Sequence, residues 1–498
     1  MKKIAIIGGG VAGLSAGIYA LKSGFACDIY EQHIFAGGQC TSWKRKGYHI
    51  DNCVHWLTGT NPSTQMHQVW KELHVLGDDI PVIQNESFLH LESEGESLDL
   101  WQDTHRLRQD LLQLSPVDAD AINEFVDQIE VYKGMDMPAL KPIEQLSIKE
   151  FWLLLKKLRP IGKIHGKLSR ISLQQYAKRF KHPLLQKMIL AYMPHTYNVS
   201  SWLFVLGTFC SGNGALPKGG SEGITHRMID QFLALGGTIH TRKKAVAFTY
   251  GKKCISGVTF SDGTTATADY YIAACDTAVT FKQLLHPKYI DKFFKEHYSN
   301  KQAHPVYSSF NTYLAVDADT SFLGDTTWFD CYPYWAVGRV QKNILLKNFA
   351  SEPGFSPAGK NLLQTLLAQY EDDFERWEDL YLRYPEKYKE EKARLAQQIV
   401  ERIETQFPVF KGKIEVIETV SPYSFYRFCG AYKGSYMSFI LTPYAPKKSH
   451  KGRIKGLSNL YLSGQWLQPP GGLPNAAVTG RFTIQRLCKA EGIPFNQG

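Results

Sequence analysis

The sequence has no long hydrophobic run. No stretch of about 18 uncharged apolar residues occurs that is long enough to cross a bilayer. The first residues, Met1-Lys2-Lys3 and an apolar stretch, resemble a signal peptide only superficially, because Gly8, Gly9 and Gly10 interrupt the stretch and an amphipathic helix pattern follows. We therefore expect no cleaved leader and a cytoplasmic protein, either free or on the inner membrane surface.

Paired cysteine motifs are also missing. The nine cysteines are odd in number and scattered, with no C-x-x-C pair, which argues against a disulfide framework and against a zinc or other metal site. A reducing cytosol fits this pattern. Helix-turn-helix and RNA-binding signatures are absent as well, so nucleic acid is not an expected partner.

The chain is nevertheless large and folded. Its 498 residues are 44% hydrophobic and 13% aromatic, which excludes a disordered chain. At about 150 residues per domain, two or three lobes are expected.

Positive charge is concentrated in one segment. Residues 141–187 hold twelve Lys or Arg against two acids, Glu144 and Glu150, and this excess of ten equals the formal net charge of +10. Within it, the apolar run 151–155 precedes Lys156, Lys157 and Arg159. Such a pattern predicts peripheral contact with a membrane, the aromatics entering the acyl boundary and the cations meeting anionic headgroups. The alternative is a solvated basic face on a helical cap.

The order of periodic segments indicates a discontinuous layout. Residues 3–7 and 26–30 read as strands around a helix at 12–23, a βαβ opening. A mostly helical region follows from about 60 to 210, and strands return at 237–275, with a hairpin turn at 261–263 between strands 255–260 and 266–273. A second excursion, 290–455, contains a strand pattern at 306–314 and a charged helix at 385–405, before a last strand at 460–463 and a terminal helix.

The strongest chemical motif is Gly8-x-Gly10-x-x-Gly13, which follows the first strand and opens the helix. The first glycine permits a tight turn, the second lets the backbone approach a pyrophosphate, and the third brings helix and strand together. Glu31 ends the second strand, where a carboxylate accepts the hydroxyls of an unmodified adenosine ribose. The motif therefore predicts a site for ADP, which both FAD and NAD contain.

Further motifs resemble one family of flavoproteins. They are Gly37-Gly38-Gln39 after the acid, the strand region 47–51, the segment 216–220 with the strand at Val246, the stretch 419–422 with Gly430 and Gly434, and the closing run from Asn459 to Gln465 that continues through 469–474 into a helix. In this order they resemble the phytoene desaturase, carotenoid isomerase and retinol saturase family of FAD-dependent oxidoreductases over almost the whole chain.

The resemblance implies a fold and a cofactor. The fold class is α/β, with a Rossmann-like (GR2-type) FAD-binding domain built from residues 1–75, 216–290 and 455–498, and a mixed α+β substrate domain with a helical cap from 76–215 and 291–454. The cofactor is FAD, and the residues implied to bind it are Gly8, Gly10, Ala12, Gly13, Glu31, Gln32, Gly38, Gln39, Val246, Gly464, Gln465, Leu473 and Pro474.

The closing segment has a physical task of its own. A helix that starts near Pro474 directs unpaired N–H groups toward whatever lies before it, which stabilises negative charge on a reduced flavin. The sequence departs from the family at Gln465, where many relatives carry Asp. An amide still hydrogen-bonds ribityl or phosphate oxygens but brings no charge.

Catalytic side chains are less evident, because a flavin carries the hydride or electron chemistry itself. His55 follows the strand that ends at Asp51 and is a candidate to donate or accept a proton beside the flavin; the alternative is a structural histidine at a strand end. Two aromatic groups, 332–335 and 423–428, are candidates to line an apolar tunnel or simply to pack the core.

These features predict an FAD-dependent oxidoreductase that acts on a C–C or C=C bond of a lipophilic polyene or isoprenoid, by desaturation, saturation or isomerisation. An amine-oxidase-like flavoenzyme is the rival within enzymes, and a prenyl-binding protein like the GDP-dissociation inhibitors is the rival of another class. No second glycine fingerprint follows a strand, so the electron partner is left open among oxygen, a quinone, a transient nicotinamide and a reduced carrier.

Overall fold

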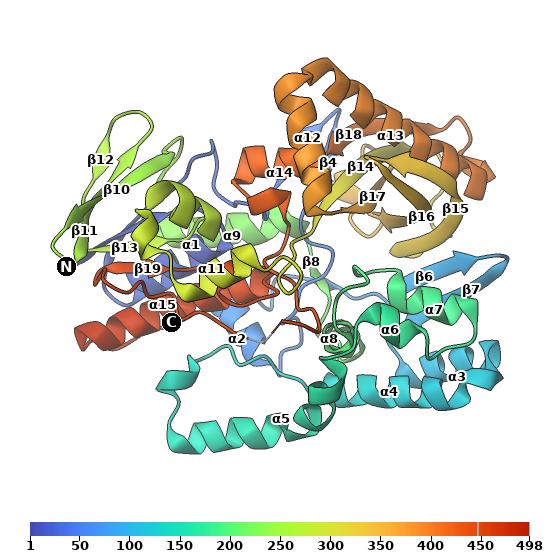
Figure 1. Cartoon of the computed structure of the whole chain (residues 1–498), viewed down its shortest axis with the longest axis horizontal. Coiled ribbons are helices and arrows are strands. Elements are labelled where there is room, and N and C mark those ends of the chain that lie inside the picture. The colour runs from blue at the N-terminus through green and yellow to red at the C-terminus, as the bar shows by residue number, and fades with distance from the viewer. Residues whose placement is uncertain (446–447, 498) are drawn as a thin grey trace.

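The first body of the protein is organised around a five-stranded parallel sheet with the order β19-β13-β1-β2-β9 (Figure 1). The computed structural model describes residues 1–445 and 448–497. The strands are β1 (Lys3–Ile7), β2 (Ala26–Tyr30), β9 (Thr238–His240), β13 (Tyr270–Ala273) and β19 (Leu460–Leu462). Three distant parts of the chain thus supply one sheet.

Side chains on alternate faces of this sheet belong to two different cores, as the two-residue period of a strand requires. Ile4 and Ile6 of β1 pack with the helices α1 (Val11–Lys22), α2 (Gln65–Glu72), α9 (Gly220–Ala234) and α15 (Leu473–Glu491). Ala5 and Ile7 face a small antiparallel sheet, β10 (Ala245–Gly251), β11 (Cys254–Phe260) and β12 (Thr265–Ala266), together with α11 (Lys292–Ser299). The parallel sheet is therefore covered on both faces, as such sheets usually are.

The second body contains a seven-stranded mixed sheet with the order β18-β14-β17-β16-β15-β6-β7. Its strands are β6 (Ser87–Ser93), β7 (Glu96–Trp101), β14 (Ser308–Val316), β15 (Thr326–Ala336), β16 (Arg339–Asn348), β17 (Asn361–Gln369) and β18 (Ile414–Val420). Because β6 lies parallel to β15, the two excursions from the first body share one sheet. Two short antiparallel pairs, β3 (Ser42–Arg45) with β4 (Tyr48–Asp51) and β5 (Val82–Ile83) with β8 (Leu216–Pro217), lie outside both large sheets.

Helices complete the second body on two sides. One group comes from the first excursion and lies together in Figure 1: α3 (Thr104–Leu114), α4 (Ala119–Lys133), α5 (Ile148–Leu168), α6 (Leu173–Ala177), α7 (Pro183–Leu190) and α8 (Val199–Cys210). The other comes from the second excursion: α12 (Glu371–Arg383), α13 (Pro385–Gln406) and α14 (Pro422–Cys429). Within residues 1–445 and 448–497, no helix combines the length and apolar character that a membrane span requires.

Two details differ from the sequence-based prediction. The predicted strand 266–273 is split: β12 closes the hairpin with β11, whereas β13 leaves it and pairs with β1 and β19 in the parallel sheet. The hairpin β6–β7 lies in a region predicted to be mostly helical. Its turn residues, Glu94 and Gly95, both have positive φ, which matches the right-handed twist of the flanking strands.

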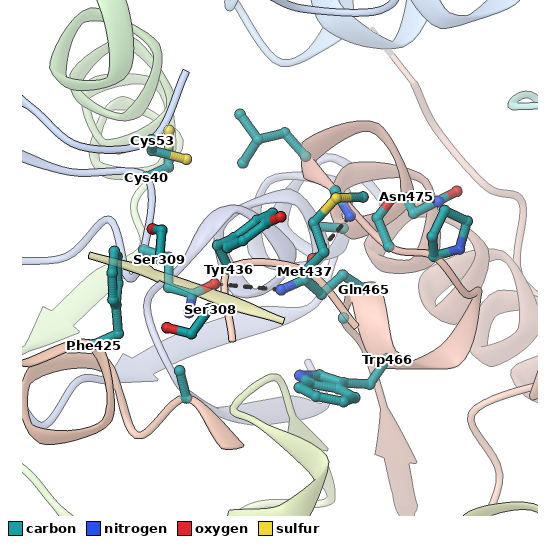
Figure 2. Close-up of a pocket in the computed structure, with 18 of the residues that line it drawn as sticks. Cys40, Cys53, Ser308, Ser309, Phe425, Tyr436, Met437, Gln465, Trp466 and Asn475 are labelled. Atoms are coloured by element: carbon teal, nitrogen blue, oxygen red, sulfur yellow. Dashed lines mark hydrogen bonds between the residues drawn. The ribbon is translucent and has the colours of Figure 1, made fainter. Parts of the chain in front are cut away.

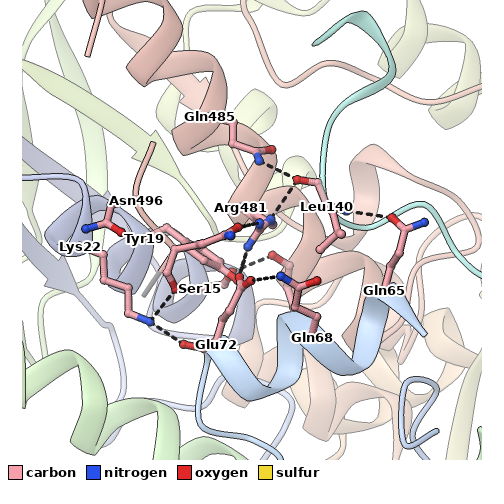
Figure 3. A network of polar contacts seen from close by, with 12 residues as sticks. Ser15, Tyr19, Lys22, Gln65, Gln68, Glu72, Leu140, Arg481, Gln485 and Asn496 are labelled. Carbon is pink, nitrogen blue, oxygen red and sulfur yellow. Dashed lines mark hydrogen bonds and ion pairs between the residues drawn. The ribbon is translucent and has the colours of Figure 1, made fainter. Parts of the chain in front are cut away.

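A buried ion pair connects the first and last helices of the chain to α2 (Figure 3). The guanidinium of Arg481 on α15 is 1% exposed and forms an ion pair with Glu72. It also donates to the Tyr19 hydroxyl at 2.9 Å and to the Leu140 carbonyl at 3.1 Å. One side chain therefore holds α15 against α1, α2 and the segment that leads into α5.

Removing one partner of this pair is expected to be costly, because the remaining charge has no compensation in the interior. We expect Glu72→Ala to lower the free energy of unfolding by about 3–5 kcal/mol. The control is Glu144→Ala, which breaks the more exposed pair with Arg486 and should cost about 0–1 kcal/mol. Urea denaturation measures both, and equal losses would contradict the structural role of the buried pair.

Candidate functional site

A cavity of about 2320 Å³ lies between the two bodies (Figure 2). Pockets for drug-sized ligands occupy about 300–1,000 Å³, so this cavity has room for a dinucleotide and a second molecule. One end is formed by the turns after β1, β2 and β13, and the other by α5, α8, β16 and β17. The two ends differ in chemistry and are described in turn.

The first end is a backbone cradle at the start of α1. Gly8 turns the chain after β1 with φ +107°, and Gly10 precedes the helix without any side-chain cap. A Cβ on Gly13 would lie 2.0 Å from the Gly8 carbonyl oxygen, so that glycine is required by packing. A Cβ on Gly10 would meet nothing closer than 3.7 Å. The protein itself does not need glycine there, and the missing side chain keeps the space before the helix N-terminus open for an anion.

Glu31 forms the wall beside this cradle and is 7% exposed. Its Oε2 accepts a hydrogen bond from the Gly9 amide at 2.8 Å, and its Oε1 accepts one from the His33 amide at 2.9 Å. The carboxylate is thus held in one orientation with lone pairs left for a ligand. Nearby, His33 lines the cavity with a buried Nδ1 that has no partner among the described residues. The Glu31 carboxylate and the His33 ring are both suited to hydrogen-bond a ribose or a base.

The start of α15 forms a second uncapped helix terminus on the same cavity. Gly471 and Gly472 both have φ +91°, and Gly472 precedes the helix with no side-chain cap. Leu473 and Pro474 line the cavity in the first turn. The exposed N–H groups carry the equivalent of about half a positive charge, which suits a ligand that gains negative charge there.

Gln465 holds this loop in place. Its Oε1 accepts a hydrogen bond from the Gly472 amide at 2.8 Å, and its Nε2 donates to Gln39 Oε1 at 3.3 Å. Gln39 in turn donates to the Ser435 carbonyl at 2.7 Å. The side-chain amide of Gln465 is therefore hydrogen-bonded to the protein, and Gln465 also lines the cavity.

Most of the residues expected to bind a cofactor come together on the cavity wall. Two do not line it: Gly13 is packed under the first turn, and Val246 points outward with 41% exposure, whereas its neighbour Ala245 lines the wall. Those that line it are Gly8, Gly10, Ala12, Glu31, Gln32, Gly38, Gln39, Gly464, Gln465, Leu473 and Pro474.

The far lobe of the cavity is mainly apolar. Of the two aromatic groups predicted to line a tunnel, Tyr334, Phe425 and Phe428 line the cavity, but Phe428 lies beside His33 at the first end. Tyr334 and Tyr423 both belong to the core of the second body. Tyr332, Trp335 and Tyr426 are exposed and do not line the cavity. The apolar lining also comes from helices and strands of both excursions: Leu154, Leu158, Ile161, Tyr192, Phe204, Val205, Ile344, Leu345, Leu366, Leu367 and Leu441.

His55 also lines the cavity, and its ring is oriented by a buried polar chain. Its Nε2 lies 3.0 Å from Gln364 Oε1, which only accepts hydrogen bonds, so Nε2 carries the proton. Gln364 donates to the Tyr313 hydroxyl, which donates to Asn52. Burial, aided by the charge of Lys347, lowers the pKa of His55. The imidazole is therefore neutral near pH 7, with its lone pair on Nδ1.

Asp276 is a wall residue that sequence reasoning missed. It follows β13, lines the cavity, and accepts hydrogen bonds from the Ala278 amide at 2.7 Å and the Tyr432 amide at 2.8 Å. Burial raises the pKa of Asp276 to about 7. The signal was present as Asp276-Thr277 shortly after the predicted strand, since Asp is typical of a helix N-cap.

The raised pKa makes stability depend on pH. In the folded state the Asp276 carboxyl group keeps its proton up to about pH 7, whereas in the unfolded chain it releases the proton near pH 4. Protonation of Asp276 therefore contributes fully to the free energy of unfolding below pH 4, and this contribution is lost as the pH rises to 7. We expect Asp276→Asn, which keeps a neutral N-cap, to remove this loss. The two unfolding free energies should diverge between pH 4 and 7, by at most about 1.4 kcal/mol per pH unit. If the unfolding free energies of the two proteins, measured by urea titration, stay parallel over this pH range, the burial assigned to the Asp276 carboxyl group is excluded.

Comparison with known sequences agrees with this geometry. Residues 6–73 match the model of an NAD(P)-binding Rossmann-like domain. Over 98% of its length the chain is 22% identical to 1-hydroxycarotenoid 3,4-desaturase of Flavobacterium sp. strain P99-3, of which 99% is covered. It is equally 22% identical to 4,4'-diaponeurosporene oxygenase of Staphylococcus haemolyticus, with 98% of each chain covered. The resemblance predicted from the motifs is thereby confirmed.

Solved structures with a similar fold include proteins named as an oxidoreductase or an oxidase. An oxidoreductase from Methanosarcina mazei superimposes with a TM-score of 0.61 at 16% identity, covering 97% of this chain and 100% of that one. Cyclohexylamine oxidase from Brevibacterium oxydans gives a TM-score of 0.58 at 12% identity, with 99% of both chains covered. These superpositions confirm the predicted α/β fold class. The predicted class of enzyme, an oxidoreductase, is supported by the names of the full-length sequence relatives.

Proposed function

We propose that this chain is an FAD-dependent oxidoreductase that acts on a C–C or C=C bond of a lipophilic polyene or isoprenoid substrate. The observation that carries the proposal is the continuity of one cavity from an ADP-type cradle to an apolar lobe. The names of the full-length relatives, a carotenoid desaturase and a diaponeurosporene oxygenase, support the same substrate class.

The residues present fit FAD. The N-terminus of α1 at Gly10 would hold the pyrophosphate, and Glu31 would accept the ribose hydroxyls. The N-terminus of α15 at Leu473 would face the flavin ring. When bound, FAD supplies the acceptor or donor of a hydride or of electrons.

The residues of the far lobe orient the substrate and exclude water. Apolar side chains from α5, α8 and β17 would enclose a hydrocarbon chain and keep it dry. This lining suits a polyene better than the charged ammonium of an amine-oxidase substrate, whose desolvation is costly. A binding protein of the GDP-dissociation-inhibitor type has no need of the open cradle at Gly10 or of a second uncapped terminus at α15.

His55 is proposed as the proton-handling group. Its Nδ1 has a lone pair and no partner among the described residues, and the ring lines the cavity. Removal or addition of hydrogen at carbon involves a proton as well as a hydride. A neutral imidazole is suited to accept that proton from the substrate or to pass it to solvent.

The cofactor assignment is tested at Gly10. We expect Gly10→Val to purify without flavin, because the new side chain fills the space before the helix terminus where the pyrophosphate would lie. The matched control is Gly354→Val, where a Cβ meets nothing within 4 Å and which should keep its flavin. Visible spectra of the purified proteins measure the flavin content. A full complement of flavin in Gly10→Val would overturn the placement.

The role of His55 is tested by substitution and by pH. Loss of a general base typically costs about 10²–10⁴-fold, so His55→Phe should lower kcat by this order while flavin content stays unchanged. In the wild type, kcat should hold as the pH falls through 6.5 and decline only below it, because the lowered pKa keeps the imidazole neutral. Anaerobic bleaching of the flavin by a polyene provides the assay. A kcat within twofold of wild type would leave His55 a structural residue.

A further inference from the structure

Helix α5 exposes an apolar stripe to solvent. A capping box between Ser147 and Glu150 starts the helix, and of its 21 residues only Ile161 and Leu168 are buried. Ile148 is 80% exposed and Trp152 65%, with Phe151 at 40% and Leu155 at 42%. Their spacing of i, i+3, i+4 and i+7 places these four side chains on one face, which we call the apolar stripe.

Cations flank the apolar stripe along one side. By helical period, Lys156, Arg159 and Lys163 lie next to it, and all three are exposed with no ion pair among the described residues. Two other cations of the region are neutralised, since Lys141 pairs with Glu150 and Lys157 with Asp136. Lys149 and Lys167 of the same helix are also exposed and form no ion pair among the described residues, so most cations of α5 are free to meet an anionic surface.

The other side of the stripe continues into the cavity. Leu154, Leu158, Ile161 and His165, spaced i, i+4, i+7 and i+11, all line it. The preceding residue Ile143 is 60% exposed and lines the same cavity. Figure 1 shows α5 at the periphery, below the α2–α15 region and beside α4. Solvent-facing apolar residues and the cavity wall therefore form adjacent strips on one helix.

We propose that α5 docks on an anionic lipid bilayer, with the apolar stripe in the acyl boundary, so that the mouth of the cavity opens directly into the lipid. An anionic bilayer is the partner that fits this surface. Its acyl region can take up the apolar stripe, and its headgroups attract the unpaired cations beside the stripe. The docking proposal rests on these exposed fractions and charges. Only the use of the docking surface as a substrate entrance rests on the proposed function.

The test is sedimentation of the purified full chain with vesicles of phosphatidylcholine alone or mixed with phosphatidylglycerol. We expect binding to the anionic vesicles that weakens as salt is raised, because exposed charges are screened within about 8 Å at 0.15 M salt. Ile148→Ser, Trp152→Ser and Leu155→Ser together should weaken partitioning at least about tenfold, as should Lys156→Glu, Arg159→Glu and Lys163→Glu together.

A matched control separates local docking from general charge. Lys252→Glu, Lys292→Glu and Lys295→Glu change the net charge equally at exposed sites outside α5, and this triple variant should bind as the wild type does. Circular dichroism verifies that each variant is folded. Should a variant unfold, docking is tested by tryptophan fluorescence instead. With anionic vesicles we expect a blue shift in the wild type that Trp152→Phe lacks, and the same response in both proteins would contradict docking through α5.

The outcomes separate the two proposals. Vesicle binding by a chain that carries no flavin would uphold docking and sink the proposed function. A yellow protein that converts detergent-dispersed polyene, yet ignores anionic vesicles, would overturn docking alone. Binding that is equal for neutral and anionic vesicles, or equally lost in the control triple variant, would overturn it too.

Discussion

The close contact between α1 and α15 is the constraint on which the site depends. A Cβ on Gly480 would lie 2.8 Å from the Ala12 carbonyl oxygen, so the two helices meet backbone to backbone. Ser15 Oγ adds a hydrogen bond to the Ala477 carbonyl at 2.7 Å. This contact fixes the uncapped N-termini of both helices on one cavity, one at the proposed pyrophosphate position and one at the proposed flavin position. Both excursions are inserted between these two fixed points.

The sequence was informative wherever function depends on short-range spacing. The strand, turn and helix around Gly8 and the acid at Glu31 follow from local rules of backbone geometry, as does the helix start at Pro474. Val246 shows where such rules stop. Neighbouring side chains in a strand face opposite sides, so the motif locates β10 correctly while Ala245, one residue earlier, lines the cavity.

Long-range pairing lay beyond the sequence. The hairpin β6–β7 finds its third partner in β15, more than 230 residues away, and no local pattern encodes that register. The environment of His55 is similar. Its ring is oriented by Gln364, which is itself held by Tyr313, so three separate segments determine the tautomer and the lowered pKa. The residue type at position 55 alone left a structural and a catalytic role open.

The arrangement around Leu140 links α5, the helix proposed to meet the membrane, to the site. The Leu140 carbonyl accepts hydrogen bonds from Arg481 at 3.1 Å and from Gln485 at 2.7 Å, both on α15. The segment that leads into α5 is therefore anchored to the same helix whose N-terminus faces the proposed flavin. Because Arg481 is also fixed by Glu72, the proposed entrance keeps a defined position relative to the proposed flavin end of the cavity. If α5 docks on lipid as proposed, a substrate too apolar for water needs no exposed transit, because the apolar stripe and the cavity wall belong to one anchored helix.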